Sequence, residues 1–282
     1  MSAPPVSRSR RIANAVRYVY LAIVALVFIL PFYWLVKTSL QPNDVIYGSD
    51  LHLVPPTITF THYQSALTEV GLVGSIVNSL LAAVGTMVLT TVVALLAAYG
   101  ITRYVFPGRR TVARLVLLTY MFPNTALIVP MYGMFAAYGL LNNPVALTLL
   151  HSMLALPFCL WILQSYLESI PRELEEAAKV EGATEFGAFR HVTVPQAMPA
   201  IVAVAILAFI ISWGEYMFAY ILTTNSAKFT VPVKVTQLLG GYQVDWGLLT
   251  AASVVVVLPV LALFWLMVKY LGKGIAKGTG AI

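Results

Sequence analysis

Charged side chains are scarce in this sequence of 282 residues, where Asp, Glu, Lys and Arg together make up only 10%. Soluble globular domains carry about 25% charged residues. Hydrophobic residues make up 60% and the mean hydropathy is +0.85, so polar groups cannot cover the surface of the folded chain. This composition excludes an ordinary soluble protein. It predicts an all-α chain in a lipid bilayer, because helices satisfy their own backbone groups there.

Cysteine is almost absent as well. The single Cys159 excludes an intrachain disulfide. It stands in an apolar run, where we expect a small buried hydrophobic residue. The net charge of +6 does not indicate a nucleic-acid partner, because the basic residues follow a membrane pattern.

Uncharged stretches define six transmembrane helices. Tyr18–Val36 is near the ~20 residues needed to span a bilayer, and no small-residue cleavage site follows it, so we expect a retained first span. Leu115–Leu167 is too long for one helix and divides at the turn formers Asn142, Asn143 and Pro144. The predicted spans are residues 18–37, 74–100, 113–136, 145–167, 197–222 and 247–269.

The basic residues predict the orientation. Segments on one side of the predicted spans hold 14 of the 17 Lys and Arg residues, and the other side holds only Lys37, Lys228 and Lys234. Basic segments stay in the cytoplasm. We therefore expect a cytoplasmic N-terminal segment at 1–17, a six-helix membrane domain at 18–272 and a cytoplasmic tail at 273–282. The connection at 168–196 also faces the cytoplasm, and 38–72 and 223–245 face outward.

The inner connection at 168–196 predicts a pair of short helices. Pro171 favours a helix start, and acidic residues follow it at the positive end of the helix dipole. Gly182 suits a left-handed residue that closes this helix. Thr184 can cap a second short helix, Glu185–His191, which should end before Pro195. The result is a hairpin with the small residues Ala177 and Ala178 on its apolar face.

Polar residues inside or between the spans give few further signals. His52 and His62 lie ten residues apart with no third ligand nearby, so no metal site is expected. His151 is isolated near the start of the fourth span, with no catalytic set around it. Glu215 is the only acidic residue well inside a span. We expect it to face a solute pathway or a partner helix, or else to lie at the membrane interface.

The spacing in this inner loop resembles a known signature. Glu176-Ala177-Ala178 is followed by three residues and Gly182, then by nine residues and Val192-Thr-Val-Pro195. This resembles the signature loop of bacterial ABC-importer permeases, in which Ile and Leu stand where this chain has Val192 and Val194. The alternative is an ordinary amphipathic helix pair at the membrane surface.

Further stretches resemble the MalG-like permeases of carbohydrate importers. They are Asn78-Ser-Leu, Ala98-Tyr-Gly with the following Arg103–Arg109, Trp213-Gly-Glu-Tyr216 and the Gly-rich tail 274–280. Members of that subfamily often have Asn where this chain has Gly214. The resemblance covers nearly the whole chain and implies a type I importer permease fold in the plasma membrane.

The resemblance also implies partners and roles. The loop containing Glu176, Ala177, Ala178, Gly182 and Pro195 would couple the spans to a cytoplasmic ATPase. That ATPase, a dimer, would bind ATP and magnesium, because this chain has no phosphate-binding loop and no cofactor of its own. A second homologous permease and an outer solute-binding protein would complete the importer. The solute would be a sugar, a polyol or a glycerol phosphate.

Two more sets of residues receive roles from the resemblance. Trp213, Glu215 and Tyr216 are pathway candidates, and Lys277 and Gly278 in the tail would approach the ATPase interface. The alternative function is an ion-coupled secondary transporter. Such carriers usually show internal repeats and paired intramembrane ionisable groups, and the sequence shows neither clearly.

Overall fold

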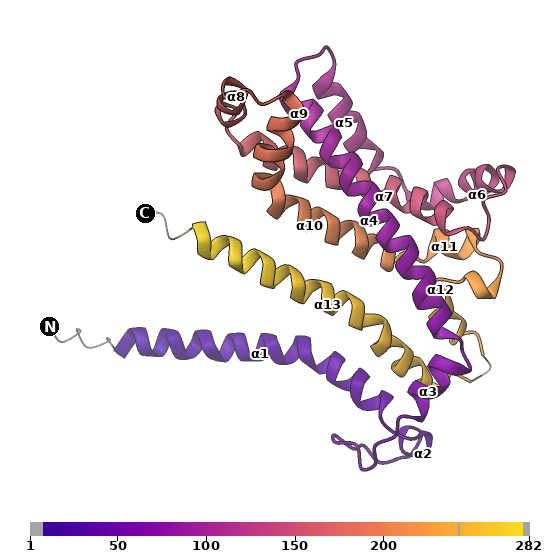
Figure 1. The fold of residues 1–282 in the computed structure, drawn as a ribbon. Helices are drawn as coiled ribbons and strands as arrows, with labels where there is room; N and C mark the ends of the chain where they lie inside the picture. The colour runs from indigo at the N-terminus through magenta and orange to yellow at the C-terminus, as the bar shows by residue number, and fades with distance from the viewer. Residues whose placement is uncertain (1–7, 242, 279–282) are drawn as a thin grey trace. The chain divides into compact units, whose positions relative to one another are not determined.

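The computed structural model describes the backbone of residues 8–241 and 243–278. Every regular element in these ranges is helical (Figure 1). Within the described ranges, five helices are long and apolar enough to cross a membrane, and a bent pair of helices, counted as one span, brings the number to six. The chain divides into two compact units, Met1–Val70 with Gly241–Val255, and Gly71–Gly240 with Val256–Ile282.

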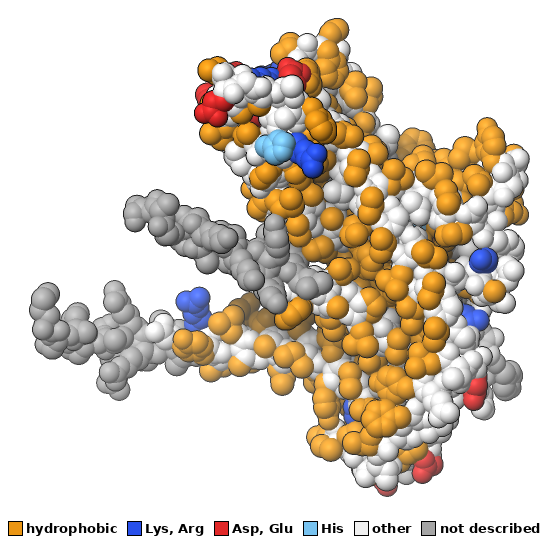
Figure 2. All heavy atoms as spheres, in the orientation of Figure 1, with side chains coloured by type: hydrophobic (Ala, Val, Ile, Leu, Met, Phe, Trp, Pro, Cys, Tyr) orange, Lys and Arg blue, Asp and Glu red, His pale blue; other side chains and the backbone are white. Residues whose placement is uncertain are grey.

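Apolar side chains are exposed on the long helices, as expected of a protein surrounded by lipid. Figure 2 shows them over much of the visible face of the second unit. On α4 (Leu72–Arg103), Val73, Leu81 and Leu96 are each more than half exposed. Monomeric soluble proteins rarely expose contiguous apolar surface of this kind. The structure therefore confirms the all-α membrane class predicted from composition.

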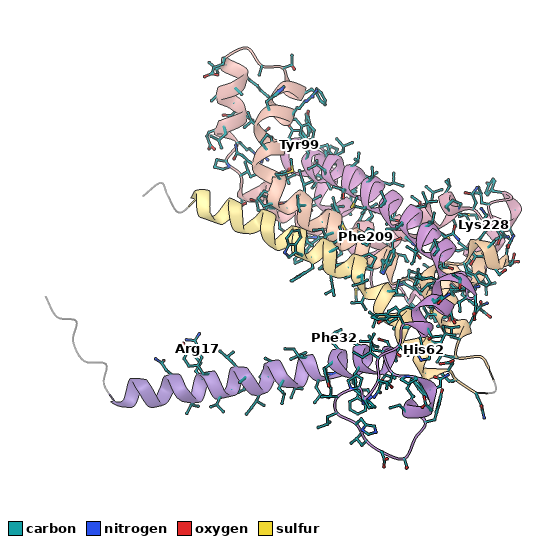
Figure 3. All side chains as sticks on the ribbon, turned by 60° about the horizontal axis from the view of Figure 1, so that its bottom comes forward. Arg17, Phe32, His62, Tyr99, Phe209 and Lys228 are labelled. Carbon is teal, nitrogen blue, oxygen red and sulfur yellow. The ribbon has the colours of Figure 1, made fainter. Side chains whose placement is uncertain are left out.

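The first unit contains α1 (Arg8–Ser39), α2 (Asn43–Ile46), α3 (Thr61–Thr68) and the beginning of α13 (Trp246–Gly278). His62, labelled in Figure 3, is buried, and its Nε2 lies 2.9 Å from the carbonyl oxygen of Gln41. A Cβ atom at Gly247 would come within 2.3 Å of the His62 ring. His62 is therefore a packing residue that needs a glycine at the start of α13.

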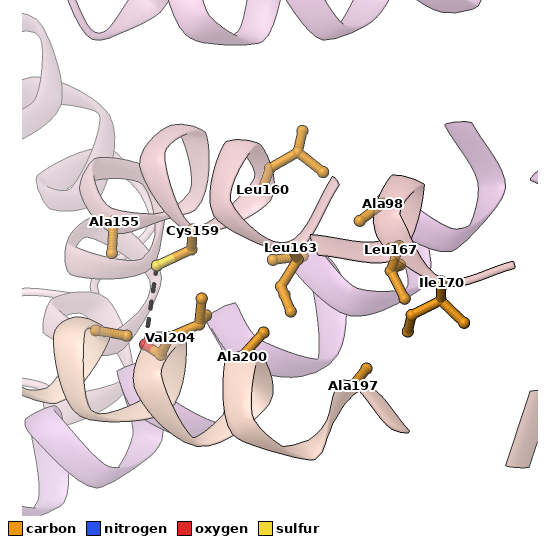
Figure 4. Close-up of a cluster of buried hydrophobic side chains, with 12 residues drawn as sticks. Ala98, Ala155, Cys159, Leu160, Leu163, Leu167, Ile170, Ala197, Ala200 and Val204 are labelled. Carbon is orange, nitrogen blue, oxygen red and sulfur yellow. Dashed lines mark hydrogen bonds between the residues drawn. The ribbon is translucent and has the colours of Figure 1, made fainter. Parts of the chain in front are cut away.

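Three helices form the centre of the second unit: α4, α7 (Pro144–Ser169) and α10 (Val194–Trp213), which pack against one another. Small residues such as Ala98, Ala155 and Ala200 lie in the contact and allow the helices to approach closely (Figure 4). Cys159 is buried among them, as predicted, with its Sγ 3.9 Å from the carbonyl oxygen of Val204.

The turn between the third and fourth spans lies at Asn142–Pro144, as the sequence predicts. Asn142 adopts a φ of 59°, and its Oδ1 accepts hydrogen bonds from the backbone N–H groups of Thr224 and Asn225, each at 2.8 Å. Asn143 caps α7 by accepting the N–H of Val145 at 2.9 Å. This turn therefore ties the start of α7 to the segment that follows the fifth span.

The predicted third span, residues 113–136, is not one straight helix. The structure has α5 (Arg109–Thr119), a short 3-10 turn η1 (Asn124–Leu127) and α6 (Ile128–Ala137), with a bend of 89° at the break. Pro123 lies in the break with an extended backbone. Proline has no N–H and disfavours the helical conformation in the residue before it, so α5 cannot continue through it.

The predicted fifth span, residues 197–222, is also interrupted. α10 ends at Trp213, and α11 (Met217–Leu222) begins after a break at Gly214–Tyr216. The prediction that the preceding short helix ends before Pro195 is wrong. Instead α9 (Glu185–Ala188) runs through a π turn, η2 (Phe189–Thr193), directly into α10. Pro195 lies in the first turn of α10, where a missing N–H is tolerated.

The outer segment after α11 is fastened to the second span. It contains η3 (Ser226–Lys228) and α12 (Val231–Gln237). The Asn78 amide donates to the carbonyl oxygens of Ala227 at 2.9 Å and Phe229 at 3.1 Å. The Ser79 hydroxyl accepts the N–H of Val231 at 2.8 Å. The Asn78-Ser79 pair that the sequence singles out therefore holds this segment against α4.

Candidate functional site: the coupling hairpin and an intramembrane polar cluster

The hairpin of the fourth connection consists of α8 (Glu173–Val180), the turn at 181–184 and α9. We call it the coupling hairpin after the role that the sequence resemblance implies. Gly182 closes α8 with a φ of +100°, which side chains with a Cβ rarely adopt. Its N–H donates to the carbonyl oxygen of Lys179 at 3.0 Å. Thr184 caps α9 by accepting the N–H of Gly187 at 3.1 Å. Both the Gly182 turn and the Thr184 cap agree with the sequence prediction.

One face of the coupling hairpin is exposed and partly apolar. Leu174 is 43% exposed, Val180 89% and Phe186 67%, and Ala177 is exposed between them. Figure 2 shows acidic and hydrophobic side chains together at the end of the unit that carries α8 and α9. Exposed apolar residues rimmed by charge mark a protein contact surface. This face is available to a partner.

The opposite face of α8 is held by a buried carboxylate. Glu175 is only 5% exposed, and its Oε1 lies 2.7 Å from Arg103 Nε of α4 and accepts the Thr193 hydroxyl of η2 at 2.7 Å. The Tyr99 hydroxyl of α4, labelled in Figure 3, donates to Oε2 at 3.1 Å. Glu175 thus joins the coupling hairpin to the second span and to the start of the fifth.

Further contacts brace the base of the hairpin. The Arg103 guanidinium also donates to the carbonyl oxygen of Ile170 at 3.2 Å, and the Arg172 side chain donates to that of Thr102. On the exposed side, Glu185 accepts the Tyr104 hydroxyl at 2.7 Å and pairs with Lys179 at 3.1 Å. These two contacts lower the pKa of Glu185, and the hydrogen bond from Tyr104 is the largest single cause.

A second group of polar side chains is buried where α7 meets the break between α10 and α11. His151 is fully buried, with Nδ1 2.7 Å from the Ser212 hydroxyl and Nε2 3.1 Å from Glu215 Oε2. Glu215 also accepts the backbone N–H groups of Phe218 at 2.9 Å and Ala219 at 3.0 Å. The carboxylate therefore caps α11 and links it to α7.

The family of the chain follows from comparison with known proteins. Residues 90–277 match the family described as binding-protein-dependent transport system inner membrane component. The match covers α7, the coupling hairpin and the fifth span. The chain belongs to this family.

Relatives of known name agree with this membership. A trehalose transport system permease protein of Mycobacterium tuberculosis is 32% identical over 253 residues, which cover 89% of this chain and 92% of the relative. A probable ABC transporter permease of Pyrococcus horikoshii is 32% identical over 255 residues, again covering 89% and 92%. This inner membrane component is therefore a non-catalytic transport subunit of the plasma membrane.

A solved structure shares the fold. It is a bacterial ABC transporter involved in the import of the acidic polysaccharide alginate, and one of its chains matches with a TM-score of 0.82 at 24% identity. The match covers 95% of this permease and 99% of that chain. The importer permease fold expected from the sequence is confirmed.

The structure brings together most of the residues that the sequence assigned to coupling. Glu176, Ala177 and Gly182 lie exposed on one hairpin with the half-buried Ala178. Pro195 lies apart from them, beyond the π turn. The sequence argument missed Glu175, although acidic residues in the fourth connection and basic residues in the second are predicted on the same side of the membrane.

The three pathway candidates separate in the structure. Trp213 is buried, donates its indole N–H to the carbonyl oxygen of Val256 at 3.2 Å and stacks on Phe209. Tyr216 stacks on Tyr220 and is partly exposed. Only Glu215 joins the polar cluster. Lys277 and Gly278 end α13, and their surroundings lie outside what the structure describes.

The sequence argument that left His151 isolated is wrong, because Ser212 and Glu215 both contact it. These contacts were missed because both residues are more than sixty positions away along the chain. Glu215 contacts His151 of α7. This agrees with the first of its two predicted placements, in which the carboxylate faces a solute pathway or a partner helix. Both carboxylate oxygens are engaged within the chain, so the side chain does not extend away from the helices.

We expect Glu215→Gln to reduce solute uptake several-fold while leaving the amount of permease in the membrane unchanged. The amide keeps the size of the side chain but loses the charge that holds His151 and the α11 N-terminus. Uptake kinetics and membrane abundance, measured on the same cells, give the answer. Thr223→Val is the matched control, since the Thr223 hydroxyl donates to the carbonyl oxygen of Ala219 in α11 and, in the described part of the chain, does not bond to the polar cluster. Wild-type kinetics in Glu215→Gln would assign the cluster to packing alone.

Proposed function

We propose that this chain is the membrane subunit through which an ATP-driven importer moves a sugar or a related small hydrophilic solute across the plasma membrane. The family membership supports import that depends on a binding protein. The similarity to a permease named for trehalose transport supports a carbohydrate solute. The MalG-like motifs of the sequence agree with both.

The coupling hairpin carries the proposal. Its inner face is fixed to α4 and η2 through Glu175, and its outer face presents small and apolar residues to the cytoplasm. One face of this hairpin is bonded to the membrane helices and the other is exposed to a partner. A movement of the bound partner can therefore be transmitted to the helices. Glu176, Ala177, Ala178 and Gly182 would therefore form the docking surface for an ATP-binding subunit. Pro195 would stiffen the start of the connected span.

The other parts of the importer are proposed as partners. They are a second homologous permease, a pair of cytoplasmic subunits that bind ATP and magnesium, and an outer solute-binding protein. Closure of the ATPase pair would rock the docked hairpins and, with them, α4 and α10. Lys277 and Gly278 would lie near the ATPase interface. Trp213, Glu215 and Tyr216 would influence the solute pathway through the α10–α11 break.

The ion-coupled carrier is the alternative, and one observation bears on it. His151 and Glu215 form a buried ionisable pair, and intramembrane pairs of this kind are found in proton-coupled carriers. Membership of a binding-protein-dependent family favours the ATP-driven importer instead.

Reconstituted vesicles separate the two functions. With the ATPase subunits and the binding protein present, uptake should require ATP and should survive an uncoupler that collapses the proton gradient. Radiolabelled trehalose is a first solute to test. Uptake without ATP that disappears with the uncoupler would support the carrier and contradict our proposal.

Single cysteines introduced into a Cys159→Ala background should report the orientation. We expect cysteines at Ser49 and Lys228 to react with an impermeant thiol reagent in intact cells. Both positions are exposed, and the 14-to-3 distribution of basic residues predicts that they face outward. A cysteine at Thr184, in the coupling hairpin, should react only after the cells are opened. The reverse pattern would overturn the orientation.

A further inference from the structure

A cavity in the first unit contains a cation that no other side chain in the described part of the chain neutralises. Lys37, in the last turn of α1, is 6% exposed and lines a cavity of about 480 Å³. Its Nζ lies 3.8 Å from the centroid of the Trp34 ring. Within the described ranges no carboxylate forms an ion pair with it. A buried ammonium needs an opposite charge, and one aromatic ring compensates it only in part.

The position of the cavity says what can reach it. α1 carries an apolar window at Val16–Ser39 that is long enough to cross a bilayer, so Lys37 lies at the end of a span. Trp34 and Trp246, at the beginning of α13, both line the cavity and are 41% and 51% exposed. Tryptophan is enriched where membrane meets water. The cavity therefore lies at the level of the phospholipid headgroups.

The remaining lining matches a headgroup in chemistry. Pro31 and Leu35 of α1 provide apolar lining, and Asp50 and His52 line the cavity from the loop that follows α2. The exposed apolar residues Leu26 and Leu30 continue along α1. A diacyl phospholipid carries its charges at the headgroup and its apolar chains below it. The volume is also within the range of small-molecule sites, about 300–1,000 Å³.

We propose that this cavity binds the headgroup of a membrane phospholipid, with the phosphate on Lys37 and the acyl chains along α1. Because Asp50 lines the same cavity, the site selects a headgroup whose ammonium has N–H groups to donate to a carboxylate. Phosphatidylethanolamine has such a group, whereas the trimethylated ammonium of phosphatidylcholine does not. Phosphatidylglycerol would offer the same phosphate to Lys37 but no cation to Asp50, whose carboxylate would then stay uncompensated. This lipid site is independent of the proposed solute and of ATP.

Native mass spectrometry tests the site on the assembled transporter after equilibration with vesicles of phosphatidylethanolamine, phosphatidylglycerol or phosphatidylcholine. Lipid retained on this chain should be mainly phosphatidylethanolamine and should fall about tenfold in Lys37→Met, since one charge-assisted contact is lost. Lys37→Arg should keep it. Lys228→Met, which removes an exposed lysine, is the matched control and should retain as much as wild type.

Asp50→Asn provides the second arm. It should keep lipid bound but lose the preference for phosphatidylethanolamine over phosphatidylglycerol. Equal retention by wild type and Lys37→Met would overturn the proposal. So would binding of sodium glucuronate that depends on Lys37 while no lipid is retained, because the cation would then serve a carboxylate solute. Neither result depends on transport, so the importer assignment is tested separately.

Discussion

Replacing Gly182 by valine should abolish most solute uptake while the permease still reaches the membrane in normal amounts. Gly182 has a φ of +100°, and a Cβ added there meets no atom within 4 Å. The damage therefore comes from backbone strain and not from collision. For a β-branched residue in this region the strain is on the order of 1–3 kcal/mol. The turn can relieve it by moving α8 relative to α9, which displaces the docking surface.

The substitution should affect uptake much more than the stability of the membrane helices. A shift of the turn removes little buried apolar surface, so the α4–α7–α10 core should remain intact. We expect uptake to fall at least about tenfold, since 1.4 kcal/mol of lost coupling corresponds to one order of magnitude. Uptake of labelled solute, permease abundance and the amount of ATPase subunit that copurifies in detergent are measured together.

Matched variants separate strain from bulk. Gly182→Asn should be milder than Gly182→Val, because asparagine tolerates positive φ. Ala177→Trp should block docking by bulk on the exposed face and also release the ATPase. Lys179→Ala is the surface control, since its ion pair with Glu185 is exposed and contributes about 0–1 kcal/mol. Wild-type uptake and a firmly bound ATPase in both Gly182→Val and Ala177→Trp would remove the main support for the docking role.

Local rules were sufficient to predict the coupling hairpin. The Pro171 start, the acidic first turn and the Gly182 closure each depend on neighbours a few residues away. The same is true of the Asn142–Pro144 turn, whose capping contact lies within three residues. These features need no knowledge of the fold, and the structure confirms them.

Contacts between distant segments could not be predicted in this way. His151, Ser212 and Glu215 meet because α7 packs beside α10, and no spacing in the sequence encodes that packing. The break of the third span at Pro123 was foreseeable as a kink, but its angle of 89° depends on what surrounds it. The π turn before Pro195 also went unpredicted. Such a turn lets a helix take in one extra residue and continue, whereas the sequence argument expected the helix to end before the proline.

Glu175→Ala should be the most disruptive single change in the coupling hairpin, although Glu175 lies outside the family signature. Its carboxylate is the only acidic partner of Arg103 in the described part of the chain, and the Arg103 side chain is 8% exposed. Removal of one partner from a buried ion pair costs about 3–5 kcal/mol, because the other charge stays buried and unpaired. The hydroxyls of Tyr99 and Thr193 lose their acceptor as well.

The expected result is a hairpin that detaches from the spans. Amide hydrogen exchange should rise across 173–193 and stay low in the centres of α4 and α7, because only local contacts are lost. Uptake should fall by more than about tenfold. The ATPase subunit should still bind the exposed face in this variant, so ATP hydrolysis without uptake is the signature of a detached coupling element.

Two control variants test whether the effect of Glu175→Ala comes from breaking the ion pair with Arg103. Glu173→Gln changes an exposed acidic residue on the same helix and should leave uptake and exchange near wild type. Combining Glu175→Leu with Arg103→Met replaces both charges by apolar groups and should recover part of the protection, since no buried charge is left unpaired. If Glu175→Ala exchanges and transports like Glu173→Gln, the buried pair does not brace the hairpin. The link from the ATPase to the spans would then run through the other contacts of the hairpin with α4 and its end, those of Arg172 and Glu185.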